Sequence, residues 1–86
     1  MAHFAKIDNN QVKEVIVVSN DDCNNLEFPA SEPVGQAFIA SLGIEGEWLQ
    51  TSYNGNFRMN FAGIGWIFDA TLGDYGAFYY PEAPLA

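Results

Sequence analysis

The sequence predicts a mainly β, α+β fold with one short helix, arranged as a small curved sheet or barrel. Short runs of β-branched and aromatic residues recur along the chain, and clusters of Asn, Asp and Gly separate them, as in short strands joined by turns. One segment, which begins at Ser31, combines a helix start signal with apolar residues at helical spacing. The 86 residues, 49% of them hydrophobic, are enough for one core, so we expect a single domain over 1–86.

The chain begins with two predicted strands, at 2–7 and 11–19, which the turn cluster Asp8-Asn9-Asn10 joins. Their spacing fits a hairpin with a three-residue loop. The β-branched run at the end of the second strand predicts burial on both faces of the sheet. Residues 19–30, rich in Asn and Asp, are predicted to form a loop.

The predicted helix follows this loop. Ser31 is a favoured N-cap residue, and Glu32 and Pro33 are typical of a first turn. Apolar residues at helical spacing predict its buried face; they are Val34, Ala37, Phe38 and Leu42. Gly43 is placed to end the helix in the left-handed conformation. A helix of about eleven residues is marginal alone, so it is expected to pack on the sheet.

The pair Asn54-Gly55 predicts a hairpin with a two-residue type I′ turn, because both central positions of that turn need positive φ. Alternation of side chains along its strands separates an apolar from a polar face. The apolar face carries Trp48, Phe57, Met59 and Phe61, and the polar face carries Thr51, Tyr53, Asn56, Arg58 and Asn60.

Two further strands and a tail complete the expected chain. Residues 62–65 form a glycine-containing bend, a strand runs from Trp66 to Phe68 and ends at Asp69, and residues 72–76 form a turn before a last strand at 77–80. Residues 80–86 contain Pro81 and Pro84 and are expected to extend as a tail. The predicted order is β-β-α-β-β-β-β.

The composition disfavours several classes of function. Eleven acidic and three basic residues give a net charge of −8, which repels nucleic-acid backbones and anionic membranes. The one Cys and the one His lie in different elements, and no metal-ligand spacing is present, so we expect no catalytic set, no cofactor and no metal. A weak Ca²⁺ loop at 21–25 and a carboxylate pair at Asp69 and Asp74 are both disfavoured. The first residues lack the apolar run of a signal peptide, so a cytosolic protein, or one released by lysis, is the default expectation.

The chain resembles a family of short, uncharacterised proteins of tailed bacteriophages, especially marine cyanophages. The opening MAHFAKIDNNQVKEVIVV and the stretch WLQTSYNGNFRMNFAGIGWIFD carry the resemblance; the matching positions are Trp48, Gln50 to Asn54, Arg58, Asn60 to Gly65, Phe68 and Asp69. Two features depart from the family, which often has Lys where Met59 stands and often continues beyond the Pro-rich segment. The resemblance implies an SM-like or SH3-like small barrel and a virion-associated or tail-associated role, with host cytoplasm or a virion as the expected location.

Two functions of different classes follow from these observations. The first is a non-enzymatic phage structural or virion-associated protein that contacts a phage protein or its own copies. Its candidate interface consists of Thr51, Tyr53, Asn54, Asn56, Arg58 and Asn60. The second is an acidic effector that inhibits a host protein, by nucleic-acid mimicry in one version. An SM-like nucleic-acid-binding module is a third alternative, against which the charge argues.

Overall fold

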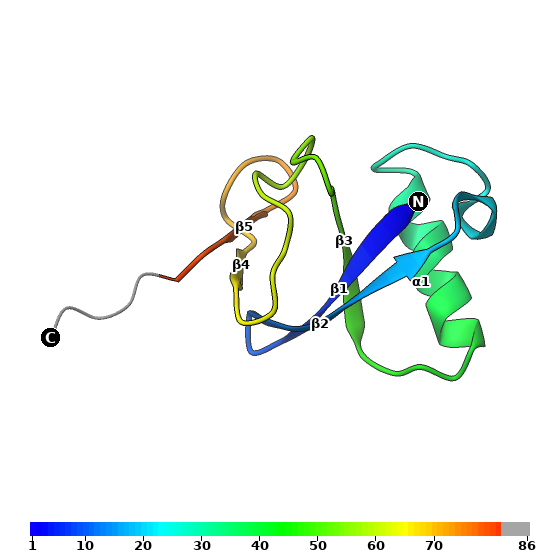
Figure 1. Cartoon of the computed structure of the whole chain (residues 1–86), viewed down its shortest axis with the longest axis horizontal. Helices are drawn as coiled ribbons and strands as arrows, with labels where there is room; N and C mark the ends of the chain where they lie inside the picture. Colours follow the sequence, from blue (N-terminus) through cyan, green and yellow to red (C-terminus); the bar gives the residue numbers. More distant parts are fainter. Residues whose placement is uncertain (82–86) are drawn as a thin grey trace, which may run out of the picture.

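The structure is a computed structural model that describes residues 1–81, so the expected tail at 80–86 lies mostly outside the described residues. The elements follow one another as β1 (Ala2–Asp8), β2 (Gln11–Val18), the 3₁₀ turn η1 (Asn20–Cys23), α1 (Ser31–Ser41), β3 (Glu47–Thr51), β4 (Ile67–Asp69) and β5 (Ala77–Tyr79) (Figure 1). None of the helical segments within residues 1–81 has the length and apolar character needed to span a bilayer.

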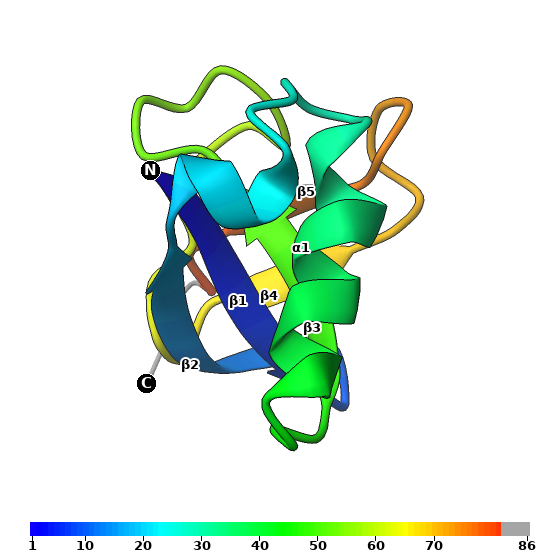
Figure 2. The same cartoon turned by 90° about the vertical axis from the view of Figure 1, so that its right-hand side faces the viewer.

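The strands form one antiparallel sheet in the order β3-β1-β2-β4-β5. The sheet curls into a half-barrel, and α1 lies across the face formed by β1 and β3 (Figure 2). The prediction of a mainly β fold with one helix and a curved sheet is therefore confirmed.

The first hairpin closes with two residues rather than the three expected. Asn9 and Asn10 both adopt the left-handed conformation, with φ of 52° and 62°, while Asp8 pairs with Gln11. Asparagine tolerates this conformation better than other residues with a Cβ, so the pair forms the tight turn that a twisted hairpin requires. The register then shifts between Lys6 and Ile7, which places a bulge in the hairpin.

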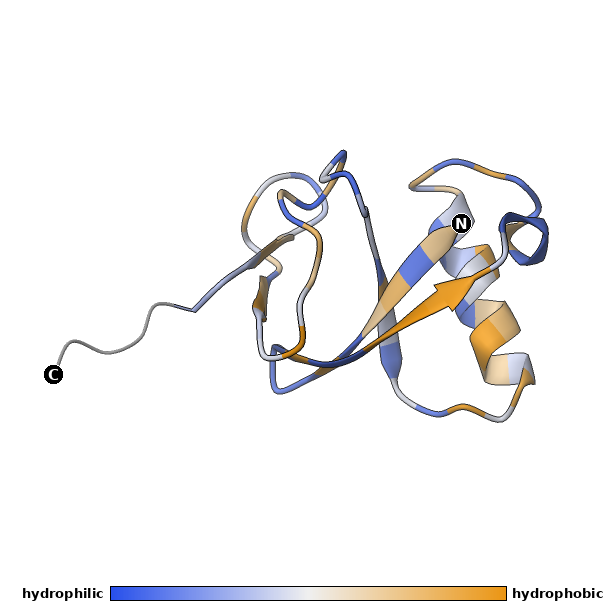
Figure 3. Ribbon diagram, viewed as in Figure 1, coloured by the Kyte–Doolittle hydropathy of each residue, from blue (hydrophilic) through white to orange (hydrophobic). Residues whose placement is uncertain are grey.

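Two clusters of buried side chains lie against the sheet. The cluster beneath α1 consists of Ala2, Phe4, Val18, Cys23, Ile39 and Trp48. The second cluster consists of Ala5, Ile7, Val12, Ala62, Phe68 and Phe78. Because neighbouring strand residues point to opposite faces, β1 contributes to both clusters. The end of β2 is strongly hydrophobic (Figure 3), but the expected burial on both faces is wrong for Val17, which is 52% exposed.

The helix has the predicted extent but buries a different face. Its buried residues are Ser31, Gly35 and Ile39, whereas Leu42 of the predicted face is exposed. Gly35 presents no side chain to the ring of Phe4, so the helix backbone approaches the sheet closely at this position. Steric fit at Gly35 thus determines the rotation of α1, and the apolar periodicity does not.

The ends of α1 also differ in part from expectation. Ser31 is the first helical residue instead of the N-cap, and its backbone N–H donates to Glu27 O at 3.0 Å. Ala30 occupies the cap position without a side-chain hydrogen bond. Gly43 has φ of 78°, as predicted for the residue that ends the helix.

The predicted hairpin around Asn54-Gly55 does not form. Gly55 N donates to Ser52 O at 3.0 Å, so Tyr53 and Asn54 are the central turn residues and Gly55 follows them with φ of 69°. Arg58 and Met59 then both adopt the left-handed conformation, with φ of 54° and 70°. Two such residues in succession interrupt a strand, and the register expected for 48–61 is therefore wrong.

The segment 58–62 instead bridges the two outer strands. Phe78 of β5 donates from its N–H to Arg58 O at 3.0 Å, and Asn60 Nδ2 donates to Phe78 O at 2.9 Å. On the other side, Ala62 N donates to Thr51 Oγ1 of β3 at 2.9 Å. This irregular segment therefore connects β5 to β3 and satisfies polar groups at both edges of the half-barrel.

Candidate functional site

Arg58 is an internal link between three parts of the chain. Its Nε donates to Tyr75 O at 2.9 Å and its Nη1 to Gln50 O at 2.8 Å. Both terminal nitrogens also bind the carboxylate of Glu32 on α1, with Nη2 at 3.2 Å from Oε1. The side chain of Arg58 is 6% exposed and that of Glu32 is 17% exposed. A charge this deeply buried is stabilised only by such complete pairing.

The same ion pair covers the outer edge of β3. Gln50 N donates to Glu32 Oε2 at 2.7 Å, while Arg58 binds the carbonyl of the same residue. One turn further along α1, Gln36 Nε2 donates to Trp48 O at 2.6 Å. Side chains thus occupy backbone groups that an incoming strand would need, so β3 is blocked against strand addition at these residues.

An aromatic cluster packs beside the guanidinium. The rings of Phe28 and Phe57 stack with centroids 3.8 Å apart, and Tyr75 meets Phe28 edge-on at 5.0 Å. The Arg58 Cζ lies 5.1 Å from the centroid of Phe28, within the range of a cation–π contact. The loop before α1 is therefore held to the loop at 56–57 by ring packing as well as by charge.

The six predicted interface residues divide into two groups. Thr51 is 2% exposed, and Arg58 and Asn60 bind backbone groups inside the fold. The other three, Tyr53, Asn54 and Asn56, are exposed on the loop that follows β3. The expected placement of Arg58 and Thr51 on a solvent-facing strand is therefore wrong, because the chain turns inward at Arg58 to reach Glu32.

The exposed aromatic surface near Tyr53 is called the Tyr53 face. It consists of Met1, His3, Val17, Tyr53, Asn54 and Phe61. His3 pairs with Val17 on one neighbouring strand, and its ring stacks on Tyr53 with centroids 5.5 Å apart. Tyr53 and Val17 are 68% and 52% exposed. The face contains no acidic residue.

His3 contributes a titratable group to this face. Burial lowers the pKa of its imidazole below the ordinary value of 6.5, and the positively charged N-terminus lowers it further. The Tyr53 face is therefore uncharged at this position at neutral pH.

The single cysteine is part of the core beneath α1. Burial, and secondarily the charge of Asp22, raises the pKa of the Cys23 thiol above its usual value. The thiol packs in the cluster that contains Phe4 and Ile39 and is 1% exposed. It behaves as a small apolar side chain.

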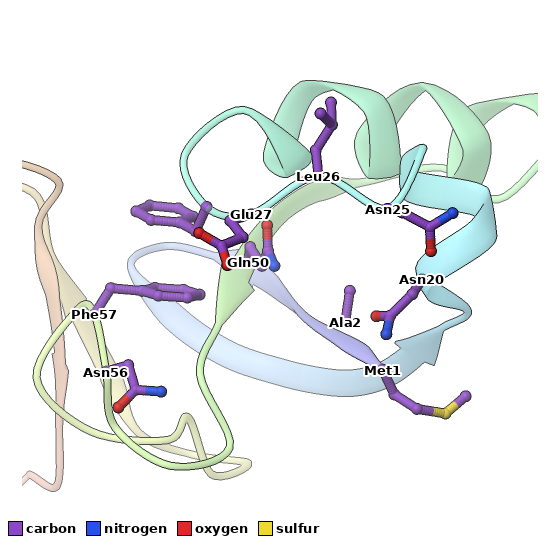
Figure 4. Close-up of a pocket in the computed structure, with 10 residues that line it drawn as sticks. Met1, Ala2, Asn20, Asn25, Leu26, Glu27, Gln50, Asn56 and Phe57 are labelled. Atoms are coloured by element: carbon purple, nitrogen blue, oxygen red, sulfur yellow. The ribbon is translucent and has the colours of Figure 1, made fainter.

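A second surface feature is a polar cleft of about 700 Å³, called the amide cleft (Figure 4). Four carboxamide side chains and one carboxylate form most of its polar lining; they are Asn20, Asn25, Gln50, Asn56 and Glu27. Met1, Ala2, Leu26, Phe28 and Phe57 contribute the apolar lining. The carboxamides come from η1, the loop after η1, β3 and the loop at 56–57.

No protein-family model, curated protein or solved structure matches this chain. The assignment of the Tyr53 face and the amide cleft as candidate sites therefore depends on the geometry of this structure alone. Of their residues, Tyr53, Asn54 and Asn56 were predicted from the sequence. His3, Val17 and Gln50 were not predicted as site residues. Each lies within a strand, and its neighbours in the sequence do not reveal which loop packs beside it in the fold.

Proposed function

We propose that this chain is a non-enzymatic, phage-related structural or virion-associated protein that acts through protein–protein contacts at the Tyr53 face. The observation that carries the proposal is the exposure of Tyr53 and Val17, at 68% and 52%, on one surface whose residues include no acid. Apolar and aromatic side chains gathered on the surface of a small protein are typical of an interface. Tyrosine in particular is enriched among residues that contribute most to binding.

A second copy of the same chain is the partner that the charge distribution favours. With a net charge of −8, two copies repel each other over most orientations. The Tyr53 face lacks acidic residues, so two copies that meet there bury aromatic surface without opposing carboxylates. The face is small, so the contact between two isolated copies is weak and gains strength where a particle holds many copies together.

The phage setting rests on the sequence resemblance over the opening strands and residues 48–69. Within that stretch Arg58 and Asn60 support the loop from inside the fold, and Tyr53 lies at its surface. The motif that residues 48–69 share with the family therefore fits a loop that Arg58 and Asn60 hold in place and that presents Tyr53 to a partner.

The experiment that tests the proposal is mass spectrometry of purified virions from a phage whose genome carries this sequence. We expect the protein in the particle, in a constant ratio to the major capsid protein across preparations. A protein that is abundant in infected cells and missing from the particles would refute the virion role. That result would favour the acidic effector, whose binding to a basic host site weakens steeply as salt rises.

A further inference from the structure

The amide cleft contains a carboxamide that is fixed in orientation before any ligand arrives. Gln50 is 7% exposed, and its side-chain Oε1 accepts a hydrogen bond from Ser31 Oγ at 2.6 Å. Its backbone N–H and carbonyl are bound by Glu32 and Arg58. Gln50 Nε2 donates no hydrogen bond to another group within residues 1–81, and because no buried side-chain nitrogen or oxygen there lacks a partner, this nitrogen is open to the cleft. Figure 4 shows the side chain at the cleft wall. Gln50 therefore presents a solvent-accessible donor on a largely buried side chain whose position is set from three sides.

The other polar groups of the cleft complement this donor. Asn25 donates from Nδ2 to Asp21 at 3.2 Å, which leaves its Oδ1 as an acceptor. Asn56 is held by its backbone N–H, which donates to Ser52 Oγ at 2.9 Å, so its side chain stays available. Carboxamides offer a donor and an acceptor on one planar group. A ligand with neighbouring hydroxyls, each of which both donates and accepts, matches this wall.

The charge of the cleft limits the ligand further. Among its lining residues, all within the described part of the chain, Glu27 is the charged side chain and Lys and Arg are missing. Phosphates, nucleotides and other anions would meet the Glu27 carboxylate, which only the α-ammonium group of Met1 among the lining residues offsets, and are disfavoured. The rings of Phe28 and Phe57 add an apolar surface against which the C–H groups of a sugar ring can pack.

We propose that the amide cleft binds a neutral carbohydrate, a mono- or disaccharide unit, with Gln50 as the fixed donor and Asn56 and Glu27 as further hydrogen-bonding partners. The volume of about 700 Å³ lies within the range of small-molecule sites and accommodates one or two sugar rings. The cleft is open to solvent and offers few hydrogen bonds to an uncharged ligand, so millimolar binding of an isolated sugar is expected. This site shares Met1 but no other lining residue with the Tyr53 face, and it does not depend on the proposed function.

The test is an NMR titration of the intact chain with glucose, galactose, N-acetylglucosamine and their disaccharides. For at least one of these sugars we expect saturable shifts of the side-chain amide signals of Gln50 and Asn56. Asn56→Ala removes one hydrogen-bonding group and should weaken that binding about fivefold or more. Gln50→Glu replaces the inward donor by an acceptor and should abolish it, while the circular dichroism spectrum shows whether this variant folds.

Asn54→Ala is the matched control, because Asn54 lies on the same loop but outside the cleft. It should leave the affinity unchanged within a factor of about two, as expected for a side chain that makes no contact with the ligand. The proposal is overturned if no sugar shifts these amide signals. Equal weakening by Asn54→Ala and Asn56→Ala would overturn it as well.

Discussion

At the scale of single residues, Arg58 shows how one side chain can redirect the backbone. The guanidinium binds Glu32, Gln50 and Tyr75 while the backbone at Arg58 and Met59 takes the left-handed conformation. Such a conformation costs about 1 kcal/mol or more for a residue with a Cβ. A buried charge without its partner costs several times more, so the ion pair decides the path of the chain.

Arg58→Ala should therefore destabilise the fold severely. It leaves the half-buried carboxylate of Glu32 without a counter-charge, and the expected loss in the free energy of unfolding is about 3 kcal/mol. For a chain of this size this loss lowers Tm by about 10–20 °C, which calorimetry would detect. Lys13→Ala is the control, since Lys13 is exposed and should change Tm by no more than a few degrees. Equal effects of the two substitutions would contradict the internal role of Arg58.

His3 makes stability depend on pH in a defined direction. Its folded-state pKa lies below the ordinary value of 6.5 at which the unfolded chain titrates, so below pH 6.5 the unfolded chain binds more protons. The contribution of His3 to the free energy of unfolding is therefore fully present above pH 6.5 and is lost as pH drops below this value.

Urea unfolding of the wild type and of His3→Gln, above and below pH 6.5, measures this effect. The variant cannot titrate at this position. The free energy of unfolding of the wild type, relative to that of His3→Gln, should therefore increase as the pH rises. A difference that is independent of pH would show that His3 titrates normally in the folded protein.

At the scale of elements, the packing of α1 depends on Gly35. A Cβ at this position would overlap Phe4 Cζ and lie 2.6 Å from Phe4 Cε1. Alanine normally stabilises a helix interior relative to glycine by about 0.5–1 kcal/mol. Here we expect Gly35→Ala to destabilise the protein by about 1–3 kcal/mol, because Phe4 is fully buried and the helix has to move away from the sheet.

Thermal unfolding followed by circular dichroism would measure the change, with Ser41→Ala at the exposed end of the same helix as the control. That substitution should change the free energy of unfolding by about 0.5 kcal/mol or less. A Gly35→Ala protein more stable than the wild type would mean that α1 does not approach Phe4 closely.

Elements with strong local signals were predicted well, and those set by distant contacts were not. The extent of α1, the left-handed Gly43 and the presence of a turn after the first strand, though not its two-residue length, follow from propensities of a few neighbouring residues. The rotation of α1 depends on the fit of Gly35 to Phe4, which lie far apart in the sequence. Periodicity therefore located the helix but gave the wrong buried face.

Local signals and distant contacts also explain which residues of the candidate sites could be predicted from the sequence. Asn54-Gly55 indicated a turn, which forms one residue earlier at Tyr53-Asn54, so the exposure of Tyr53 and Asn56 could be foreseen. The hairpin register failed because Arg58 binds Glu32, 26 positions away, and nothing near Arg58 in the sequence reveals that partner. Gln50 was missed for the same reason, since the helix and the cleft loops converge on it only in the folded chain.

At the scale of the whole molecule, charge and aromatic surface are separated. The net charge of −8 keeps copies apart, and the Tyr53 face offers an area where they can meet without opposing acids. We expect Tyr53→Ser to weaken self-association about tenfold or more, as for a tyrosine at the centre of a contact. Tyr80→Ser is the control, because Tyr80 is also 68% exposed but packs against Trp66 rather than His3.

Sedimentation velocity of the wild type, Tyr53→Ser and Tyr80→Ser over a wide concentration range measures self-association at the Tyr53 face. We predict that the wild type and Tyr80→Ser form concentration-dependent dimers while Tyr53→Ser stays monomeric. A wild type that remains monomeric at the highest concentration, or a Tyr53→Ser protein that dimerises like the wild type, would contradict it.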